Sequence, residues 1–324
     1  MRVCVLSDCV YPTPMPDGHG LGLVTWQVAE GLRANGHDVT LIAKEGSQFS
    51  GTLHTVKGAK LYEGEILLAK DAMRLHRVYP FDVFLDNGHL HIIADMFPDV
   101  PVVNVYHDVY QPYQRCPILL SEGQRAAMPA VFENARVIHN ALNPRPFNPS
   151  FDFYEKPYAL FMGALSEIKQ PLLAIEACAR LGIDLVLAGA DVIGRFPSGA
   201  FENVQVVGSV KGAHKHALLR NARVFLQLGT NESFGLTTLE ANLSGTPVVA
   251  WATGGSVDII QDGINGAFVP MGGNAVQAVA DTIQRVWDMP RERVYAHALT
   301  FGNVNAQVAA YEDALADCMQ GVWW

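Results

Sequence analysis

Short apolar segments alternate with longer segments of helical period along most of the chain. In the first half, buried-strand patterns occupy residues 2–8, 39–43, 82–87, 100–108 and 136–141. Between the first two strands, Val24, Val28 and Leu32 repeat at helical spacing, and Gly36 stands where such a helix would end. This alternation predicts parallel sheets in an α/β architecture.

A proline-rich stretch interrupts this pattern. Residues 143–157 contain four prolines and show no clear period, which is typical of a linker between domains. The alternation then restarts, with strand patterns at 158–164, 184–190, 204–210, 224–230 and 247–252, helix patterns at 171–182 and 214–222, and helices after residue 272. The sequence therefore predicts two domains of similar size, each with its own parallel sheet.

Composition and charge narrow the class of protein. The chain has 324 residues, 49% of them hydrophobic, and a net charge of −9. This length suits two domains, and the acidic balance argues against a broad nucleic-acid or anionic-membrane footprint. Five cysteines without a CxxC pair are typical of reduced thiols. No apolar run reaches the roughly 18–20 residues of a membrane helix, and the N-terminus enters a strand directly, so we expect a cytoplasmic protein.

In open α/β sheets ligands bind beyond the carboxyl ends of the strands, so the loops after strands carry the candidate chemistry. Residues 18–22 form the first such loop, which contains Gly20 and Gly22 before a helix pattern. Glycines there allow a close approach to an anion, although a flexible connection explains them equally well. A dinucleotide GxGxxG fingerprint does not fit, because Leu23 stands where its third glycine would be.

Two further loops each offer one candidate side chain. His107 ends the strand pattern 100–108, where it could face a ligand or simply pack. Lys169 lies in the loop 163–171 between a strand and a helix. It could meet a phosphate as a point charge, and a solvated surface lysine is the alternative.

The segment 230–250 holds Glu232 and Glu240 on either side of Phe234 and Gly235. Apolar spacing predicts a helix that begins near Leu236. Thr237-x-x-Glu240 matches a capping box, which would explain Glu240 without a ligand but leaves Glu232 unexplained. Amides at a helix start, two carboxylates and further free amides at the pair 254–255 suit a polyhydroxylated phosphate ester.

Residues 232–270 resemble the signature region of glycosyltransferase family 4. The matching positions are Glu232, Glu240, Gly245, Pro247, Val248, Val249, Gly254, Gly255, Asp262, Gly263 and Gly266. The resemblance implies the GT-B fold, with two Rossmann-like, doubly wound parallel-sheet domains facing across a cleft. It also implies a retaining transferase that uses a nucleotide-diphosphate sugar and needs neither a metal nor a cofactor.

The same resemblance implies the domain limits. Residues 1–148 would be the acceptor-side domain and residues 149–300 the donor domain. Residues 301–324 would form a helix that crosses back to the first domain, with Trp323 and Trp324 packing on it or marking a partner surface.

Site residues follow from the resemblance position by position. Glu240 would bind the ribose hydroxyls and Glu232 the hydroxyls of the donor sugar, with His107 near that sugar and the acceptor. Lys169 would neutralise the diphosphate, which Gly20 and Gly22 would also approach. The loop at Val210 and Lys211 would lie near the nucleobase. Backbone amides would cradle the diphosphate at Phe234, Gly235, Leu236 and Thr237.

One position departs from the family pattern. Ala164 stands where the family usually has an arginine paired to the diphosphate, and Arg195 or Lys211 are candidates to replace it. The departure keeps a non-catalytic nucleotide-sugar-binding protein open beside the transferase. A GT-B-fold nucleotide-sugar epimerase is a third hypothesis, and a nicotinamide dehydrogenase fits least. A small molecule or a glycan is the favoured acceptor, with nucleic acid still open. The donor base, the donor sugar and the oligomeric state stay undetermined.

Overall fold

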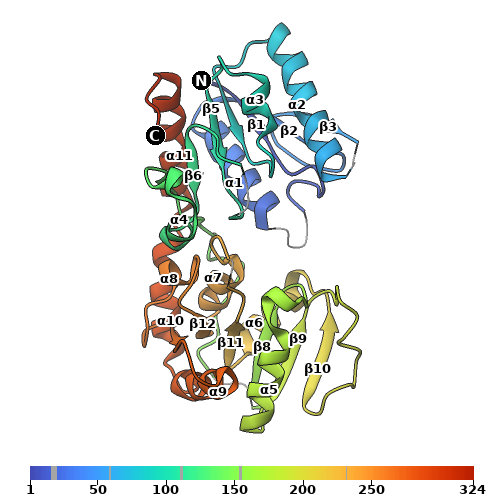
Figure 1. Cartoon of the computed structure of the whole chain (residues 1–324), viewed down its shortest axis with the longest axis vertical. Coiled ribbons are helices and arrows are strands. Elements are labelled where there is room, and N and C mark those ends of the chain that lie inside the picture. Colours follow the sequence, from blue (N-terminus) through green and yellow to red (C-terminus); the bar gives the residue numbers. More distant parts are fainter. Residues whose placement is uncertain (16–19, 58–59, 110–111, 153–154, 231) are drawn as a thin grey trace. The chain divides into compact units, whose positions relative to one another are not determined.

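The computed structural model describes residues 1–15, 20–57, 60–109, 112–152, 155–230 and 232–324. The chain forms two compact units, of which unit 1 is Met1–Ala141 with Val304–Trp324 and unit 2 is Leu142–Asn303 (Figure 1). These limits differ from the predicted boundaries after residues 148 and 300. The proline-rich segment belongs to unit 2, where the carbonyl of Ser150 accepts a hydrogen bond from the buried Arg291 guanidinium at 2.8 Å.

Unit 1 is built on a seven-stranded parallel sheet of order β3-β2-β1-β4-β5-β6-β7. Its strands are β1 Arg2–Leu6, β2 Asp38–Lys44, β3 Thr52–Val56, β4 Val83–Asp86, β5 Val102–Val105, β6 Pro117–Leu119 and β7 Arg136–Val137. Its helices are α1 Gly20–Ala34, α2 Leu61–Val78, α3 Ile92–Met96, α4 Glu122–Ala127 and α11 Val304–Met319, with a 3-10 turn at Ala130–Phe132. The apolar pattern did not predict β3 because this edge strand is largely exposed and mixed in polarity.

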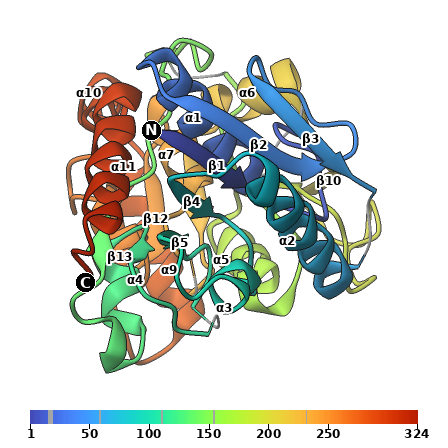
Figure 2. The same cartoon turned by 90° about the horizontal axis from the view of Figure 1, so that it is seen from above.

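The C-terminal helix α11 packs on α1 within unit 1 (Figure 2). Gly31 permits this contact, because a Cβ there would lie 2.4 Å from a methyl group of Val308. Gln27 also donates a hydrogen bond to the side-chain oxygen of Gln307 at 2.9 Å. At the end of the chain, the Trp324 indole donates to the carbonyl of Pro117 at 2.7 Å, so this residue packs on unit 1.

Unit 2 is built on a six-stranded parallel sheet of order β10-β9-β8-β11-β12-β13. Its strands are β8 Tyr158–Met162, β9 Asp184–Ala188, β10 Val204–Gly208, β11 Val224–Gln227, β12 Val248–Trp251 and β13 Gly266–Val269. Its helices are α5 Pro171–Leu181, α6 Gly212–Asn221, α7 Leu236–Leu243, α8 Ser256–Ile259, α9 Ala275–Val286 and α10 Arg291–Ala298, with 3-10 turns at Glu167–Lys169 and Leu299–Phe301. The predicted architecture of two parallel-sheet α/β domains is confirmed.

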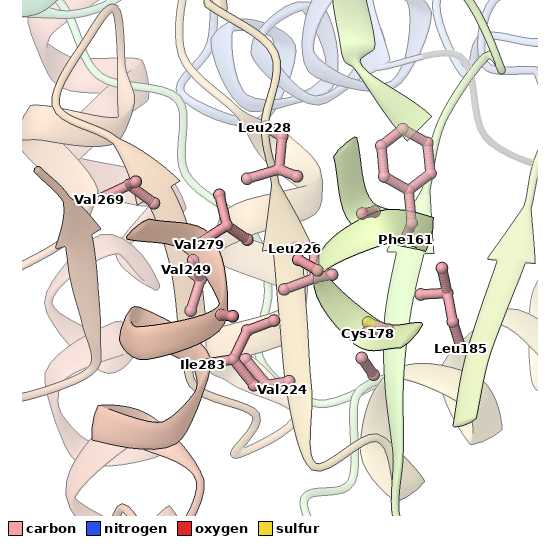
Figure 3. Close-up of a cluster of buried hydrophobic side chains, with 14 of the residues drawn as sticks. Phe161, Cys178, Leu185, Val224, Leu226, Leu228, Val249, Val269, Val279 and Ile283 are labelled. Atoms are coloured by element: carbon pink, nitrogen blue, oxygen red, sulfur yellow. The ribbon is translucent and has the colours of Figure 1, made fainter. Parts of the chain in front are cut away.

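One face of the unit 2 sheet is covered by α5 and α9. Val279 and Ile283 of α9 and Cys178 of α5 lie over Leu226 of β11 and Val249 of β12 (Figure 3). All five side chains are buried, and the apolar strand runs predicted this for Leu226 and Val249. Among the helices that the structure describes, none combines the length and the apolar composition needed to cross a bilayer.

Two loops at the carboxyl edge of this sheet meet backbone to backbone. The amide of Gly255, after β12, donates to the carbonyl of Glu232, after β11, at 2.8 Å. A Cβ on Gly254 would lie 2.2 Å from the Glu232 carbonyl oxygen, and a Cβ on Gly255 would lie 2.0 Å from that of Phe234. Only glycine fits at either position, so these two glycines fix the loop that leads into α7.

We therefore predict that Gly254→Ala destabilises unit 2 far more than Gly263→Ala. Both glycines have positive φ, but a Cβ at Gly263 would meet nothing within 4 Å. Gly263→Ala should cost about 1–2 kcal/mol of unfolding free energy from its backbone conformation alone. Gly254→Ala should cost about 1–3 kcal/mol more, because the loop must move. Denaturant-dependent hydrogen exchange of β11 and β12 measures both, and equal losses would contradict the role of the close contact.

Candidate functional site

The carboxyl edge of the unit 2 sheet collects most of the predicted site residues. All its strands run parallel, so the loops after β8, β10, β11 and β12 meet at one edge. Lys169 comes from the first of these loops, Val210 from the second and Glu232 from the third. Helix α7 follows the third loop directly and carries Glu240.

Lys169 and Glu232 form an ion pair, with their side chains 32% and 18% exposed. Gly229 leaves room for it, because a Cβ there would lie 3.0 Å from Cδ of Lys169 and 3.5 Å from a Glu232 carboxylate oxygen. Burial lowers the pKa of the Lys169 ammonium below its ordinary value of 10.5. The structure thus brings together two groups that the sequence could only place in separate loops.

Helix α7 begins at Leu236, as its apolar spacing predicted. The residue before it, Gly235, has φ +96 and no side chain of its own with which to cap the helix. The first-turn amides of a helix lack intrahelical acceptors, so the start of α7 offers N–H groups that suit an anion. The capping box is wrong: Gly235 occupies the cap position, so Thr237 and Glu240 lie too far along the helix to serve it.

Glu240 is engaged by a residue that the sequence analysis missed. Lys215 of α6 donates to its Oε1 at 2.6 Å, and the two side chains are 15% and 9% exposed. The second oxygen, Oε2, is buried and has no hydrogen-bond partner among the described residues. Lys215 and Glu240 lie on different helices, so no local spacing signals their contact.

Phe234 and the glycine pair Gly254–Gly255 offer fewer groups to a ligand than expected. The Phe234 side chain is buried, with its ring centroid 6.1 Å from that of Phe301, so only its backbone could reach a ligand. The expectation that the amides at 254–255 are free is wrong for Gly255, whose N–H donates to Glu232. These residues shape the loop, and the start of α7 remains the candidate anion-binding element.

The loops around Ala164 and Val210 complete this edge. Ala164 is exposed, and Val210 is half-buried against the sheet. Arg195, a candidate substitute for the missing arginine, forms an exposed ion pair with Glu167 at 3.2 Å. Lys211, the other candidate, is the exposed residue directly before α6.

The remaining candidates belong to unit 1. Gly20 and Gly22 lie in the first turn of α1, so the prediction of a glycine loop before the helix is wrong for them. Gly22 is buried, and a Cβ there would lie 3.4 Å from the carbonyl oxygen of Pro12. Residues 18 and 19 lie outside the described part of the chain. His107 follows β5, and its Nε2 lies 3.2 Å from the side-chain oxygen of Asn87, which follows β4.

A hollow of about 570 Å³ in unit 2 lies elsewhere. Its lining includes Asp184 at the start of β9 and Val204 at the start of β10. It therefore opens at the amino edge of the sheet, opposite the edge where α/β proteins bind ligands. Its lining also lacks the clustered charges of the carboxyl edge, so the loops described above remain the candidate site.

Residues 147–298 match the family model of the glycosyl transferases group 1. D-inositol 3-phosphate glycosyltransferases of Mycobacterium tuberculosis and Mycobacterium bovis are 31% identical to the chain over 180 residues. This match covers 48% of the chain and 37% of each relative, so the chain spans well under half of their length in the comparison.

Solved structures share the fold over the whole chain. A glycosyltransferase involved in avilamycin A biosynthesis superposes with a TM-score of 0.77 at 22% identity, covering 99% of both chains. Sucrose-phosphate synthase from Thermosynechococcus elongatus has a TM-score of 0.78 at 17% identity, covering 98% of this chain and 99% of its own. The Anabaena protein HepE, in complex with UDP and glucose, has a TM-score of 0.72 at 17% identity, with 98% and 99% covered. The chain has the GT-B fold of these proteins, and its match to the model of the glycosyl transferases group 1 lies within unit 2.

Proposed function

We propose that this protein is a retaining glycosyltransferase, which moves a sugar from a nucleotide-diphosphate donor to a hydroxyl-bearing acceptor without a metal. The observation that carries the proposal is the open start of α7, flanked by the Lys169–Glu232 and Lys215–Glu240 pairs. Together they offer cations and amides for phosphates and carboxylates for hydroxyls. A nucleotide-sugar needs both kinds of group within one site.

The diphosphate would lie at the start of α7. The amides of Leu236 and Thr237 and the positive end of the helix dipole favour an anion there. Lys169 would add a full positive charge, which grows in value as negative charge develops on the leaving diphosphate. This set of donors is the reason to propose that no divalent metal is required.

The Glu232 carboxylate would then change its partner from Lys169 to the donor sugar. In the structure its carboxylate pairs with the Lys169 ammonium. A diphosphate that attracts Lys169 would release the carboxylate for hydroxyls on the donor sugar. The ion pair between Lys169 and Glu232 would thereby be replaced by two contacts with the donor. Neither the ammonium nor the carboxylate would be left buried and unpaired.

Glu240 would bind the ribose. Its position is about 6 Å along the helix from Leu236, at 1.5 Å per residue, which matches the short distance between a diphosphate and its ribose. Its buried Oε2 has no partner among the described residues and would accept a ribose hydroxyl. Val210 and Lys211, in the loop after β10, would lie beside the base.

Unit 1 would hold the acceptor, a small molecule or a glycan, with His107 near the reacting sugar. The half-buried His107 ring, close to the Asn87 side-chain oxygen, could present an N–H to a hydroxyl. UDP- and ADP-sugars are the first donors to test, because structural neighbours were crystallised with UDP and glucose and with ADP.

A non-catalytic nucleotide-sugar-binding protein is the second candidate, and Ala164 favours it. An alanine cannot supply the charge-assisted hydrogen bonds to a diphosphate that an arginine would. Such a protein would bind donors through the same helix start and the same carboxylates. Turnover therefore decides between the two candidates, whereas binding alone does not.

Glu232→Gln should lower the rate of nucleotide release from a panel of UDP-, GDP- and ADP-sugars by about a hundredfold or more. Free nucleoside diphosphate should bind at least as tightly as before, because Lys169 would no longer have to break an ion pair with residue 232 in order to bind it. Coupled phosphate-release assays and calorimetry measure the two quantities. Glu176→Gln, at an exposed position of α5, is the control. Equal turnover of the Glu232 variant and the parent would refute the assigned role.

Nucleoside diphosphate affinity should fall as pH rises through the lowered pKa of Lys169. The protonated ammonium is the form that binds a diphosphate, and burial makes it lose its proton at a lower pH than a surface lysine would. In Lys169→Arg the guanidinium stays charged, so affinity should change only with the ligand's own titration. Calorimetry with ADP from neutral to alkaline pH measures both proteins. Parallel pH profiles would show that Lys169 does not make the contact.

Ala164→Arg should tighten nucleoside diphosphate binding about tenfold and raise the transfer rate, because a charge-assisted contact is added. The site is exposed, so the longer side chain has room. Ala200→Arg adds the same charge at an exposed position close to Asn203, whose carbonyl accepts from the start of β9 at the opposite edge. Equal effects of the two substitutions would mean that the charge at residue 164 never meets the diphosphate.

A further inference from the structure

Lys215, which is half-buried, and Glu240, which is buried, form an ion pair across two helices of unit 2. The Nζ of Lys215 on α6 lies 2.6 Å from Oε1 of Glu240 on α7. The Glu240 side chain is 9% exposed and that of Lys215 is 15% exposed. Only one carboxylate oxygen is used within the part of the chain that the structure describes, since Oε2 is buried without a partner.

An oxygen left in this way needs an explanation. A buried carboxylate oxygen without a hydrogen bond costs free energy, and buried polar atoms in folded proteins nearly always have partners. Lys215 compensates the charge of Glu240 but does not reach its second oxygen. The pair is therefore complete in charge and incomplete in hydrogen bonds, which is the state expected of a site that awaits a hydroxyl donor.

We infer that Lys215 is a positioning residue that holds Glu240 for a ribose cis-diol and makes the site select ribonucleotides over 2′-deoxyribonucleotides. This inference rests on the proposed function, because it takes the ligand to be a nucleoside diphosphate. By occupying Oε1, Lys215 fixes the carboxylate plane and aims Oε2 into the site. Without Lys215 the carboxylate could rotate, and it would be a buried charge without a counterion.

The pair also offers complementary groups to two neighbouring hydroxyls. Oε2 can only accept, so one ribose hydroxyl would donate to it. The ammonium has three N–H donors, of which Glu240 uses one, so a neighbouring hydroxyl oxygen can accept from another. Removal of either hydroxyl would leave one of these groups unpaired, and sites built this way reject the ligand that lacks the hydroxyl.

A purely structural role is the competing explanation, because the pair also joins α6 to α7. The two explanations differ in what they predict for ligand selectivity. A loosened helix pair would weaken every nucleotide alike. Loss of a held carboxylate would weaken ribonucleotides and leave their 2′-deoxy counterparts almost unchanged.

The experiment measures calorimetric affinities of the full chain for UDP, ADP and GDP and for their 2′-deoxy counterparts. The parent protein should prefer the best-binding ribonucleotide about ten- to a hundredfold. Lys215→Met should lose most of this preference through weaker ribonucleotide binding, and Lys215→Arg should keep much of it. Lys156→Met, at an exposed position of unit 2, should change nothing.

The outcomes separate the inference from the proposed function. If the parent binds none of the six nucleotides, the proposed function fails. If the parent binds and Lys215→Met keeps its ribose preference, or weakens both sugar types equally, the positioning role is overturned. Lys215→Gln, whose amide can still donate to Glu240, provides the test if the methionine variant does not fold. It should also lose most of the preference, because a shorter neutral donor holds the carboxylate less firmly than the ammonium does, and an unchanged ratio would refute the role.

Discussion

The direct backbone contact between the loops after β11 and β12 is the constraint on which the candidate site depends. Gly254 and Gly255 leave no room for a side chain against the carbonyls of Glu232 and Phe234. That contact sets the path of the chain into Gly235, and Gly235 sets where α7 starts. The path of the backbone into the start of α7 thus depends on two glycines in a different loop.

Charge at this edge is organised as two lysine–glutamate pairs, and they differ in kind. The side chains of the Lys169–Glu232 pair are 32% and 18% exposed, so under the proposed function a diphosphate would compete with Glu232 for the ammonium. In the Lys215–Glu240 pair, Oε2 of Glu240 has no partner among the described residues, so a ligand could add to this pair without breaking it. A nucleotide-sugar would meet a fixed contact at its ribose and an exchangeable one at its diphosphate and sugar. Under the proposed function, this difference would let the nucleoside bind first and would make the charge rearrangement depend on the rest of the donor.

The sequence predicted those features that depend on local pattern. The parallel sheets follow from apolar strand runs, and the start of α7 follows from the spacing of Leu236, Leu239 and Leu243. The capping box failed because a glycine with positive φ occupies the cap position, and no spacing rule separates Thr237 at the cap from Thr237 inside the helix. The sequence did not indicate Lys215 as a site residue because its partner lies on another helix. The hydrogen bond made by the Gly255 amide was not predicted either, because it joins two separate loops. Both depend on how the elements pack, which a single sequence does not encode locally.

The absence of an arginine at residue 164 is best considered together with the presence of Lys215. Arg195 forms an exposed ion pair with Glu167. Such a pair contributes little free energy, so it does not fix the guanidinium in a position to bind a ligand. Lys215, whose side chain is 15% exposed, is instead paired with the carboxylate proposed to meet the ribose. Under the proposed function, positive charge would therefore lie nearer the nucleoside than in the family pattern described above. If the site works as proposed, the nucleoside contributes more of the donor's binding energy and the diphosphate less, and donor recognition becomes less sensitive to salt, since a buried pair is screened less than an exposed one.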